Sequence, residues 1–179
     1  METCQLVCHP DTPPVAVTRI AARITPDGDW LRLRWRIEGA SALFSPKFAG
    51  KGRADNLWQS TCFELFLRQP GEQDYIELNL SPSERWAAYA FRGYREGMTE
   101  HPMPREPNCT MRLGQTLAIF DAAVPMATLP SLPWECAMTA VIEESGGTKS
   151  YWAVSHPGGK PDFHDPSCFT ATVPAPDAT

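Results

Sequence analysis

The middle of the chain alternates between apolar and polar residues with the two-residue period of a β-strand. Segments 61–68 and 75–80 each place three large apolar residues on one face. These residues are Phe63, Leu65 and Leu67 in the first segment and Ile76, Leu78 and Leu80 in the second. Side chains on a strand point alternately to its two faces. The two segments therefore predict a hairpin, joined by residues 69–74, with one apolar face turned to a core.

The same alternation recurs along the chain, with turn signals at short intervals. Segments 15–25 and 30–37 flank Pro26-Asp27-Gly28-Asp29, which favours a tight turn between antiparallel strands. The other expected strands are 85–91, 108–113, 116–124, 134–143, 149–156 and 168–173. About ten short strands without an amphipathic helix predict an all-β fold, an antiparallel β-sandwich or jelly roll.

The length of 179 residues fits one domain that buries most of its apolar surface. Proline-rich residues open the first strand pattern near Thr12, and another proline ends the last strand at Pro174. We expect a single domain over 12–174, with 1–11 and 175–179 as flexible termini.

The face opposite the apolar triplets carries the polar candidates. Glu64 lies on this face in the first strand of the hairpin, and Tyr75, Glu77 and Asn79 lie on it in the second. A one-residue slip would turn the apolar side chains to the wrong face, so Glu64 is opposite either Glu77 or Asn79. Like charges directly opposite each other repel, whereas a carboxylate and an amide share hydrogen bonds. We therefore favour Glu64 opposite Asn79.

Aromatic residues accompany this polar pair. Trp58 lies six residues before Glu64, and Phe66 and Tyr75 flank it in the two strands. A pyranose suits such a surface, because its C–H face packs on an indole and its hydroxyls donate to a carboxylate. The alternative is a solvated outer face whose acids pair with arginines. A row of such arginines, Arg32, Arg34 and Arg36, follows the turn, and one of them is a further candidate contact.

The segment HPGGKPDFHDP, residues 156–166, is a second concentration of polar groups. Its prolines restrict the backbone, so His156 and Lys160 could reach over a sheet face. A metal site would use His156, Asp162 and His164, although their spacing matches no known ligand rule. A loop whose aspartates bond to its own backbone is the alternative.

Composition limits the classes of partner. A net charge of −5 lacks the basic footprint of a nucleic-acid binder, and no run of 18 apolar residues could span a membrane. The first residues show no secretory signal, which predicts a cytoplasmic protein whose six cysteines are reduced.

Two runs of residues carry a family resemblance. They are ADNLWQSTCFELFLRQPGEQDYIELNLSPSERWAAYAF and YWAVSHPGGKPDFHDPSCF. Together they resemble the bacterial DOMON-like domains, which are similar to family 9 carbohydrate-binding modules and to the haem- or sugar-binding DOMON domains of cytochrome-type proteins. The resemblance implies a β-sandwich with a ligand site on one concave sheet face or at its rim.

The resemblance also implies roles for single residues. By it, Trp58 would stack on a sugar, Glu64 would bind hydroxyls, and Trp86 or Trp152 would complete an aromatic sandwich. The turn Ser81-Pro82-Ser83 departs from the family pattern because it has no glycine. The haem-binding relatives use an axial methionine and histidine, and no such pair matches here, although His156 is the best placed histidine.

We therefore predict a non-catalytic domain that binds a small molecule, a saccharide or a similar polar ligand, without a cofactor. The alternatives are a haem- or metal-binding domain and a glycoside-active enzyme that uses Glu64 and Glu77 as its acid and base. The candidate ligand-binding residues are Trp58, Glu64, Tyr75, Glu77, Asn79, Trp86, Trp152, His156 and Lys160.

Overall fold

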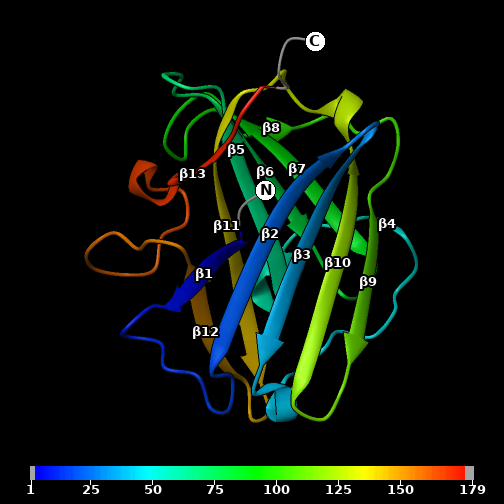
Figure 1. Cartoon of the computed structure of the whole chain (residues 1–179), viewed down its shortest axis with the longest axis vertical. Helices are drawn as coiled ribbons and strands as arrows, with labels where there is room; N and C mark the ends of the chain where they lie inside the picture. Colours follow the sequence, from blue (N-terminus) through cyan, green and yellow to red (C-terminus); the bar gives the residue numbers. More distant parts are fainter. Residues whose placement is uncertain (1–2, 176–179) are drawn as a thin grey trace.

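The computed structural model describes residues 3–175 of the chain. This part contains thirteen strands and four short 3-10 helices, joined by loops (Figure 1). The strands are β1 (Thr3–Cys8), β2 (Arg19–Asp27), β3 (Trp30–Glu38), β4 (Gly52–Arg53), β5 (Cys62–Arg68), β6 (Tyr75–Leu80), β7 (Arg85–Phe91), β8 (Thr99–Glu100), β9 (Asn108–Leu113), β10 (Leu117–Pro125), β11 (Trp134–Glu144), β12 (Thr148–Ala153) and β13 (Ala171–Val173). The 3-10 helices are η1 (Ala40–Ala42), η2 (Leu57–Gln59), η3 (Met126–Thr128) and η4 (Pro166–Cys168).

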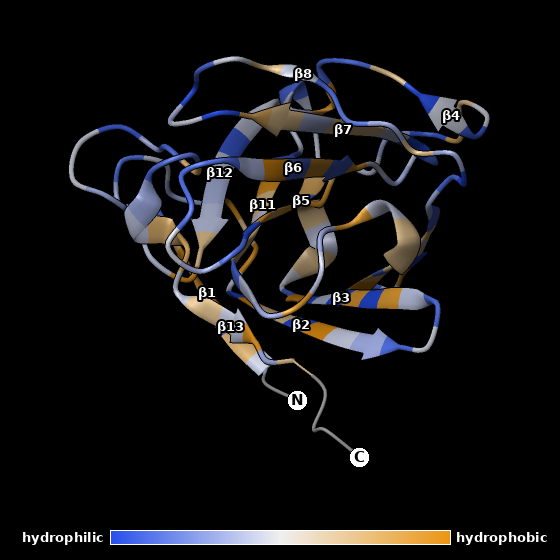
Figure 2. Ribbon diagram, turned by 90° about the horizontal axis from the view of Figure 1, so that it is seen from above, coloured by the Kyte–Doolittle hydropathy of each residue, from blue (hydrophilic) through white to orange (hydrophobic). Residues whose placement is uncertain are grey.

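The strands form two layers. One contains β2, β3, β10 and β9, and the other contains β4, β7, β6, β5, β11 and β12 in that order. Seen from above, β2 and β3 lie in one layer and β6 and β7 in the other (Figure 2). Strand β13 pairs with β11, and β8 pairs with β7. The neighbours are antiparallel except for β4 and β7, which are parallel, so the expectation of purely antiparallel sheets was wrong at this edge.

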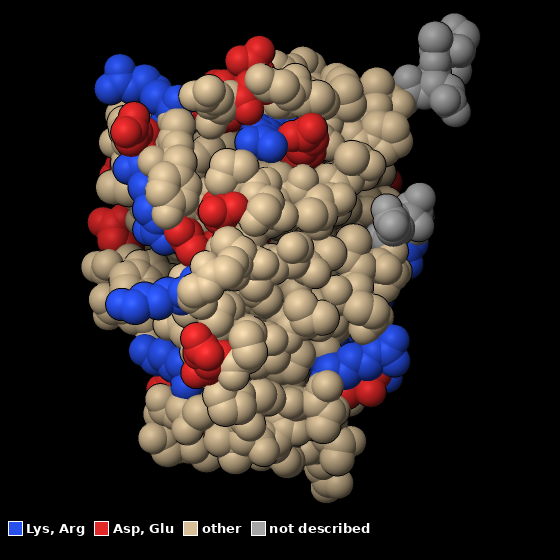
Figure 3. Space-filling view, turned by 90° about the vertical axis from the view of Figure 1, so that its left-hand side faces the viewer, with Lys and Arg blue, Asp and Glu red and all other residues tan. Residues whose placement is uncertain are grey.

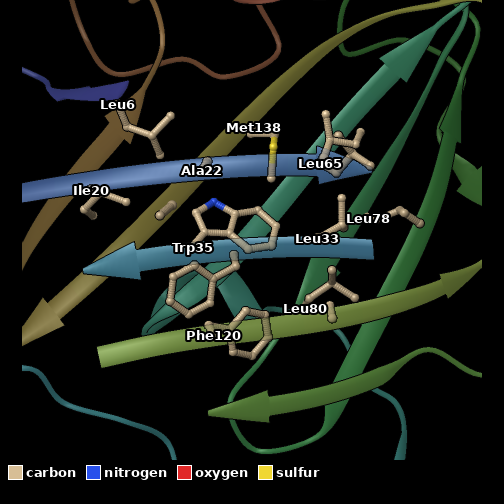
Figure 4. Close-up of a cluster of buried hydrophobic side chains, with 14 of the residues drawn as sticks. Leu6, Ile20, Ala22, Leu33, Trp35, Leu65, Leu78, Leu80, Phe120 and Met138 are labelled. Atoms are coloured by element: carbon tan, nitrogen blue, oxygen red, sulfur yellow. The ribbon is translucent and has the colours of Figure 1, made fainter. Parts of the chain in front are cut away.

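The apolar face of each layer is turned toward the other layer. In β3 the residues Leu31, Leu33, Trp35 and Ile37 are buried while the intervening arginines are exposed, as the alternation predicts. Trp35 lies 5.3 Å from Phe63 of β5, and Phe63 stacks on Phe120 of β10 at 4.2 Å between ring centroids. Leu65, Leu78 and Met138 face Trp35 and Phe120 from the opposite layer (Figure 4). This packing fixes which face of β5 and β6 is turned outward.

The N-terminal segment is a correction to the expected domain boundaries. Residues 1–11 were expected to be a flexible terminus. Residues 1–2 lie outside the described residues, but β1 pairs with β2 through Thr3–Leu6 and with β12 through Val7 and Cys8. It therefore joins the two layers into one curled sheet. Strands β4 and β8 were also not predicted, since two residues give no detectable period. Of the expected C-terminal tail 175–179, residues 176–179 lie outside the described residues.

The surface shows how charge is distributed over the fold. On the side of the molecule drawn in Figure 3, acidic and basic side chains are interspersed rather than separated by sign. Within residues 3–175, no helix is long and apolar enough to cross a membrane.

Candidate ligand-binding groove

A groove of about 1070 Å³ lies on the outer face of the layer that contains β5, β6 and β7. Three connecting segments supply its walls, through Asp55, Asn56, Trp58, Arg95, Met98, Thr99, Glu100, Lys160, Pro161, Phe163 and His164. Three neighbouring strands supply most of its floor, with the side chains of Glu64, Phe66, Glu77, Asn79, Tyr89 and Phe91. Val141 of β11 and Tyr151 of β12 also line the groove. These residues alternate with the core residues of the same strands, so the period that builds the core also builds the groove.

The register of the strands arranges the polar floor in rows. Glu64 is directly opposite Asn79, which confirms the predicted pairing. On its other side Glu64 is opposite Thr139 of β11. In the next row Glu77 lies between Phe66 of β5 and Tyr89 of β7. The two carboxyl groups therefore sit on adjacent strands and one row apart.

The polar floor is buried and only partly satisfied by hydrogen bonds. Glu64, Glu77 and Asn79 are 3%, 7% and 2% exposed. The amide nitrogen Nδ2 of Asn79 donates to Glu77 Oε1 at 2.8 Å, and the Thr139 hydroxyl donates to Glu64 Oε2 at 3.4 Å. The amide oxygen Oδ1 of Asn79 is buried and has no partner among the described residues. A buried acceptor without a donor is costly, so this oxygen marks a place for a ligand donor.

Burial changes how the two carboxyl groups ionise. Burial raises the pKa of Glu77 to about 7, although the hydrogen bond from Asn79 and the charge of Arg95 act in the opposite direction. Burial, reinforced by the nearby Glu77, raises the pKa of Glu64 well above its usual range. Low-dielectric surroundings disfavour the charged form of an acid. The pair therefore keeps protons at a pH at which exposed glutamates are fully ionised.

His164 and Tyr75 support Glu77 from one wall of the groove. The backbone N–H of Arg95 donates to the Tyr75 hydroxyl oxygen at 3.2 Å, and this hydroxyl lies 2.7 Å from His164 Nδ1. Burial, with the charge of Arg95, lowers the pKa of His164 to about 4, so its ring is neutral. The Tyr75 hydroxyl then donates to Nδ1, which leaves the proton on Nε2, 3.8 Å from Glu77 Oε2.

The rim of the groove carries an exposed indole. Trp58 lies in η2, is 47% exposed and lines the groove. Tyr89 also lines the groove, and its hydroxyl donates to Asp55 Oδ1 at 2.5 Å. This bond fixes the tyrosine ring against the loop that precedes η2. Lys160 also lines the groove, from the predicted polar loop, with an exposed side chain.

Four of the nine predicted residues do not line the groove. Trp86 and Trp152 are both 4% exposed and lie in the core between the layers. The Trp86 indole N–H donates to Glu106 at 3.4 Å, and that of Trp152 donates to Ser150 at 2.8 Å. The reason is the pleat: Tyr89 faces the groove, so Trp86, three residues earlier on β7, faces the core. The proposed second tryptophan of an aromatic sandwich was therefore wrong.

The other two residues lie near the groove or beyond it. Tyr75 acts behind the lining through His164, as described above. The Val7 carbonyl oxygen accepts a hydrogen bond from the Nε2–H group of His156 at 2.9 Å. This bond holds the loop to β1. The arginines of β3 are far from the floor in the fold, on the outer face of the other layer. Their partners are acids, Asp27 for Arg32, Asp121 for Arg34 and Glu38 for Arg36.

Sequence reasoning missed several groove residues. Tyr89 and Phe91 had a usable signal, since their alternation with Trp86 places them on the opposite face of the third strand. Asp55, Arg95 and Phe163 come from loops, whose approach to the sheet no local pattern encodes. His164 was considered only as a metal ligand with His156 and Asp162. The described residues contain no group of three or more histidine, cysteine or acidic side chains that could hold a metal ion.

Comparison with known proteins defines the fold. No family model matches the chain, and no curated protein matches it. A solved structure from Bacteroides uniformis, provisionally described as a carbohydrate-binding protein, is similar over 98% of this chain and 86% of its own, with a TM-score of 0.68 and 17% identity. The chain shares the β-sandwich fold of such proteins.

Two further structures support the same conclusion. A family 9 carbohydrate-binding module from Caldicellulosiruptor kristjanssonii in complex with glucose is similar over 90% of this chain and 78% of its own, with a TM-score of 0.55 and 10% identity. A structure of a family 9 module from the same organism in complex with cellotriose covers 87% of this chain and 75% of its own, with a TM-score of 0.52 and 11% identity. At these low sequence identities, the similarity is evidence of a shared fold alone.

Proposed function

We propose that the groove binds a saccharide without cleaving it. One observation carries this proposal: the exposed indole of Trp58 stands at the rim of a groove whose floor presents two buried carboxyl groups and an unpartnered amide oxygen. An indole offers an apolar face to the C–H groups of a pyranose. Glu64, Glu77 and Asn79 offer acceptors to its hydroxyls. The glucose and cellotriose bound in two solved structures of the same fold support this ligand class.

The arrangement of the acids favours binding over hydrolysis. A glycosidase needs two carboxyl groups that flank the scissile bond, one on the side of the leaving oxygen and one on the opposite side of the sugar. Glu64 and Glu77 instead project from adjacent strands of a single floor. They can hold two hydroxyls of one sugar, which is the geometry of recognition.

The family and the setting of the domain belong to the same proposal. We infer that the chain is a DOMON-like domain that acts in the cytoplasm and needs no cofactor for binding. A haem-binding domain is the alternative, and the absorption spectrum of the purified protein with added haemin tests it. A stoichiometric Soret band would contradict the saccharide proposal.

The deciding experiment is a titration of tryptophan emission and of heat with glucose, cellotriose and a panel of other saccharides. We expect saturable binding by the native chain, loss of binding in Trp58→Ala, and at least about tenfold weaker binding in Glu64→Gln, because the glutamine replaces a carboxyl oxygen that accepts from the sugar with an N–H₂ group that cannot. Leu113→Ala and Glu72→Gln are matched controls, since these residues are exposed and lie outside the groove lining. Binding that is unchanged in Trp58→Ala would contradict the site.

A further inference from the structure

We propose that the saccharide bound in this groove carries a primary amine, whose ammonium group sits against Glu64, Glu77 and Asn79. The inference rests on the proposed saccharide site and specifies its ligand. Its basis is the combination, on one buried floor, of acceptor atoms without donors, carboxyl groups without a cation, and aromatic rings on both sides of one carboxyl group.

With both acids ionised, the floor presents acceptors in excess of donors. Asn79 Oδ1 is buried and without a partner, and the amide nitrogen of Asn79 is already used by Glu77. The Thr139 hydroxyl likewise donates to Glu64 Oε2. Both of these side-chain donors are therefore already bonded to the two acids and cannot donate to a ligand. An ammonium group has three N–H donors and no acceptor, whereas a hydroxyl has one donor and two lone pairs. Once the acids have released their protons, three neighbouring acceptors match an ammonium better than a hydroxyl.

Among the described residues, neither acid is paired with a permanently charged side chain, although Arg95 in the groove wall acts on Glu77 through its charge. Among residues 3–175, Glu64 forms no salt bridge, and the contact of Glu77 is with His164 Nε2 at 3.8 Å. His164 is neutral near pH 7, because burial lowers its pKa to about 4. Arg95 is held by Asp162 at 2.8 Å, and Lys160 is exposed at the rim, where Asp55 and Glu100 also lie. Buried carboxyl groups without a cation keep their protons, and a bound ammonium would release them.

Aromatic rings flank the position where the charge would sit. Phe66 and Tyr89 are the cross-strand neighbours of Glu77 on its two sides, and both line the groove. A cation near an aromatic ring is attracted by the negative face of the ring, and desolvation strengthens the attraction. A neutral hydroxyl gains nothing comparable. Phe66 and Tyr89 thus add a second favourable contribution to binding, and this contribution requires a positively charged ligand.

Three trisaccharides that differ only at C2 test the inference. Cellotriose carries a hydroxyl there, fully deacetylated chitotriose carries an amine, and N-acetylated chitotriose carries a neutral amide. At a salt concentration near 0.15 M, which screens exposed charges beyond about 8 Å, we expect chitotriose to bind at least about tenfold more tightly than cellotriose. The acetylated form should bind no more tightly than cellotriose, because it has lost the charge.

Two further measurements place the ammonium group at the acids. Calorimetry in buffers of different ionisation enthalpy should show proton release with chitotriose and none with cellotriose. In Glu77→Gln the preference for chitotriose should fall to within about threefold, while Glu72→Gln, on the loop of the same hairpin, should keep the full preference. Trp58→Ala should weaken the binding of both sugars.

Each outcome separates this inference from the proposed function. If cellotriose binds as tightly as chitotriose, the amine is wrong and the saccharide site stands. If chitotriose is preferred but Glu77→Gln keeps that preference, the ammonium does not sit at these acids and the inference is wrong. If none of the three sugars binds, both proposals are wrong.

Discussion

At the scale of single residues, the groove depends on the buried carboxyl group of Glu77, which ionises at a higher pH than an exposed glutamate. Glu77 is 7% exposed, and burial raises its pKa to about 7. In the unfolded chain the same group ionises near its ordinary value of about 4.3. The folded state therefore holds a proton that the unfolded state has lost between these two values. The consequence is a stability that depends on pH.

The sign of that dependence can be tested with Glu77→Gln. Stability from the proton on Glu77 is fully present below about pH 4.5 and is lost as the pH rises through about 7, by at most about 3.5 kcal/mol. Between about pH 5 and pH 7.5 the native chain should thus lose stability relative to Glu77→Gln, as urea unfolding would show. His164 acts in the opposite direction, because its lowered pKa costs stability as the pH falls below about 6.5, but both proteins share that effect. A difference that is constant with pH would contradict the assignment.

At the scale of elements, one side chain decides where a strand begins. Segment 15–25 was predicted as a single strand, but β2 begins at Arg19. Glu144, at the end of β11, is 1% exposed and accepts the backbone N–H groups of Val15, Ala16 and Val17 at 2.6–3.0 Å. A carboxylate that accepts three consecutive backbone N–H groups replaces the hydrogen bonds of a strand, so residues 15–17 do not extend β2.

Glu144→Gln tests this contact with almost no change of shape. A glutamine has one acceptor oxygen where the carboxylate has two, and its N–H₂ group would face backbone donors. We expect a loss of about 2–3 kcal/mol in the free energy of unfolding, measured with urea. Glu72→Gln, which is exposed, is the control and should change little. A loss below about 0.5 kcal/mol would show that the carboxylate does not hold the segment.

At the scale of the whole molecule, β1 makes one curled sheet of two layers. It pairs with β2 in one layer and with β12 in the other, and Leu6 reaches into the core. Without β1, the edges of β2 and β12 would be unpaired. Exposed strand edges are templates for association between chains.

Removal of residues 1–8 should therefore lower the stability of the fold by more than the loss of the Leu6 side chain alone. We expect the truncated chain to unfold at markedly lower urea concentration and to associate, as sedimentation would show. Leu6→Ala keeps the strand and should cost about 2–4 kcal/mol without association. A truncated chain with unchanged stability would mean that β1 is dispensable for joining the layers.

Much of the fold followed from local pattern. The main strands, the inward faces of β3, β5 and β6, and the pairing of Glu64 with Asn79 were all predicted, because side-chain alternation and like-charge repulsion act between near neighbours. The tryptophans show the limit of that reasoning. Both faces of β7 and β12 carry aromatic residues, so hydropathy alone did not say that Trp86 and Trp152 belong to the core.

The sequence by itself determined which residues share a face of each strand, since that depends only on the period of the backbone. Only the tertiary structure decided which face became the groove, since that depends on where the second layer packs. It also brought Trp58, Arg95 and His164 into one groove with Glu77, from segments far apart in the chain. Contacts of this kind depend on how connections cross the sheet, and no local pattern of residues encodes that path.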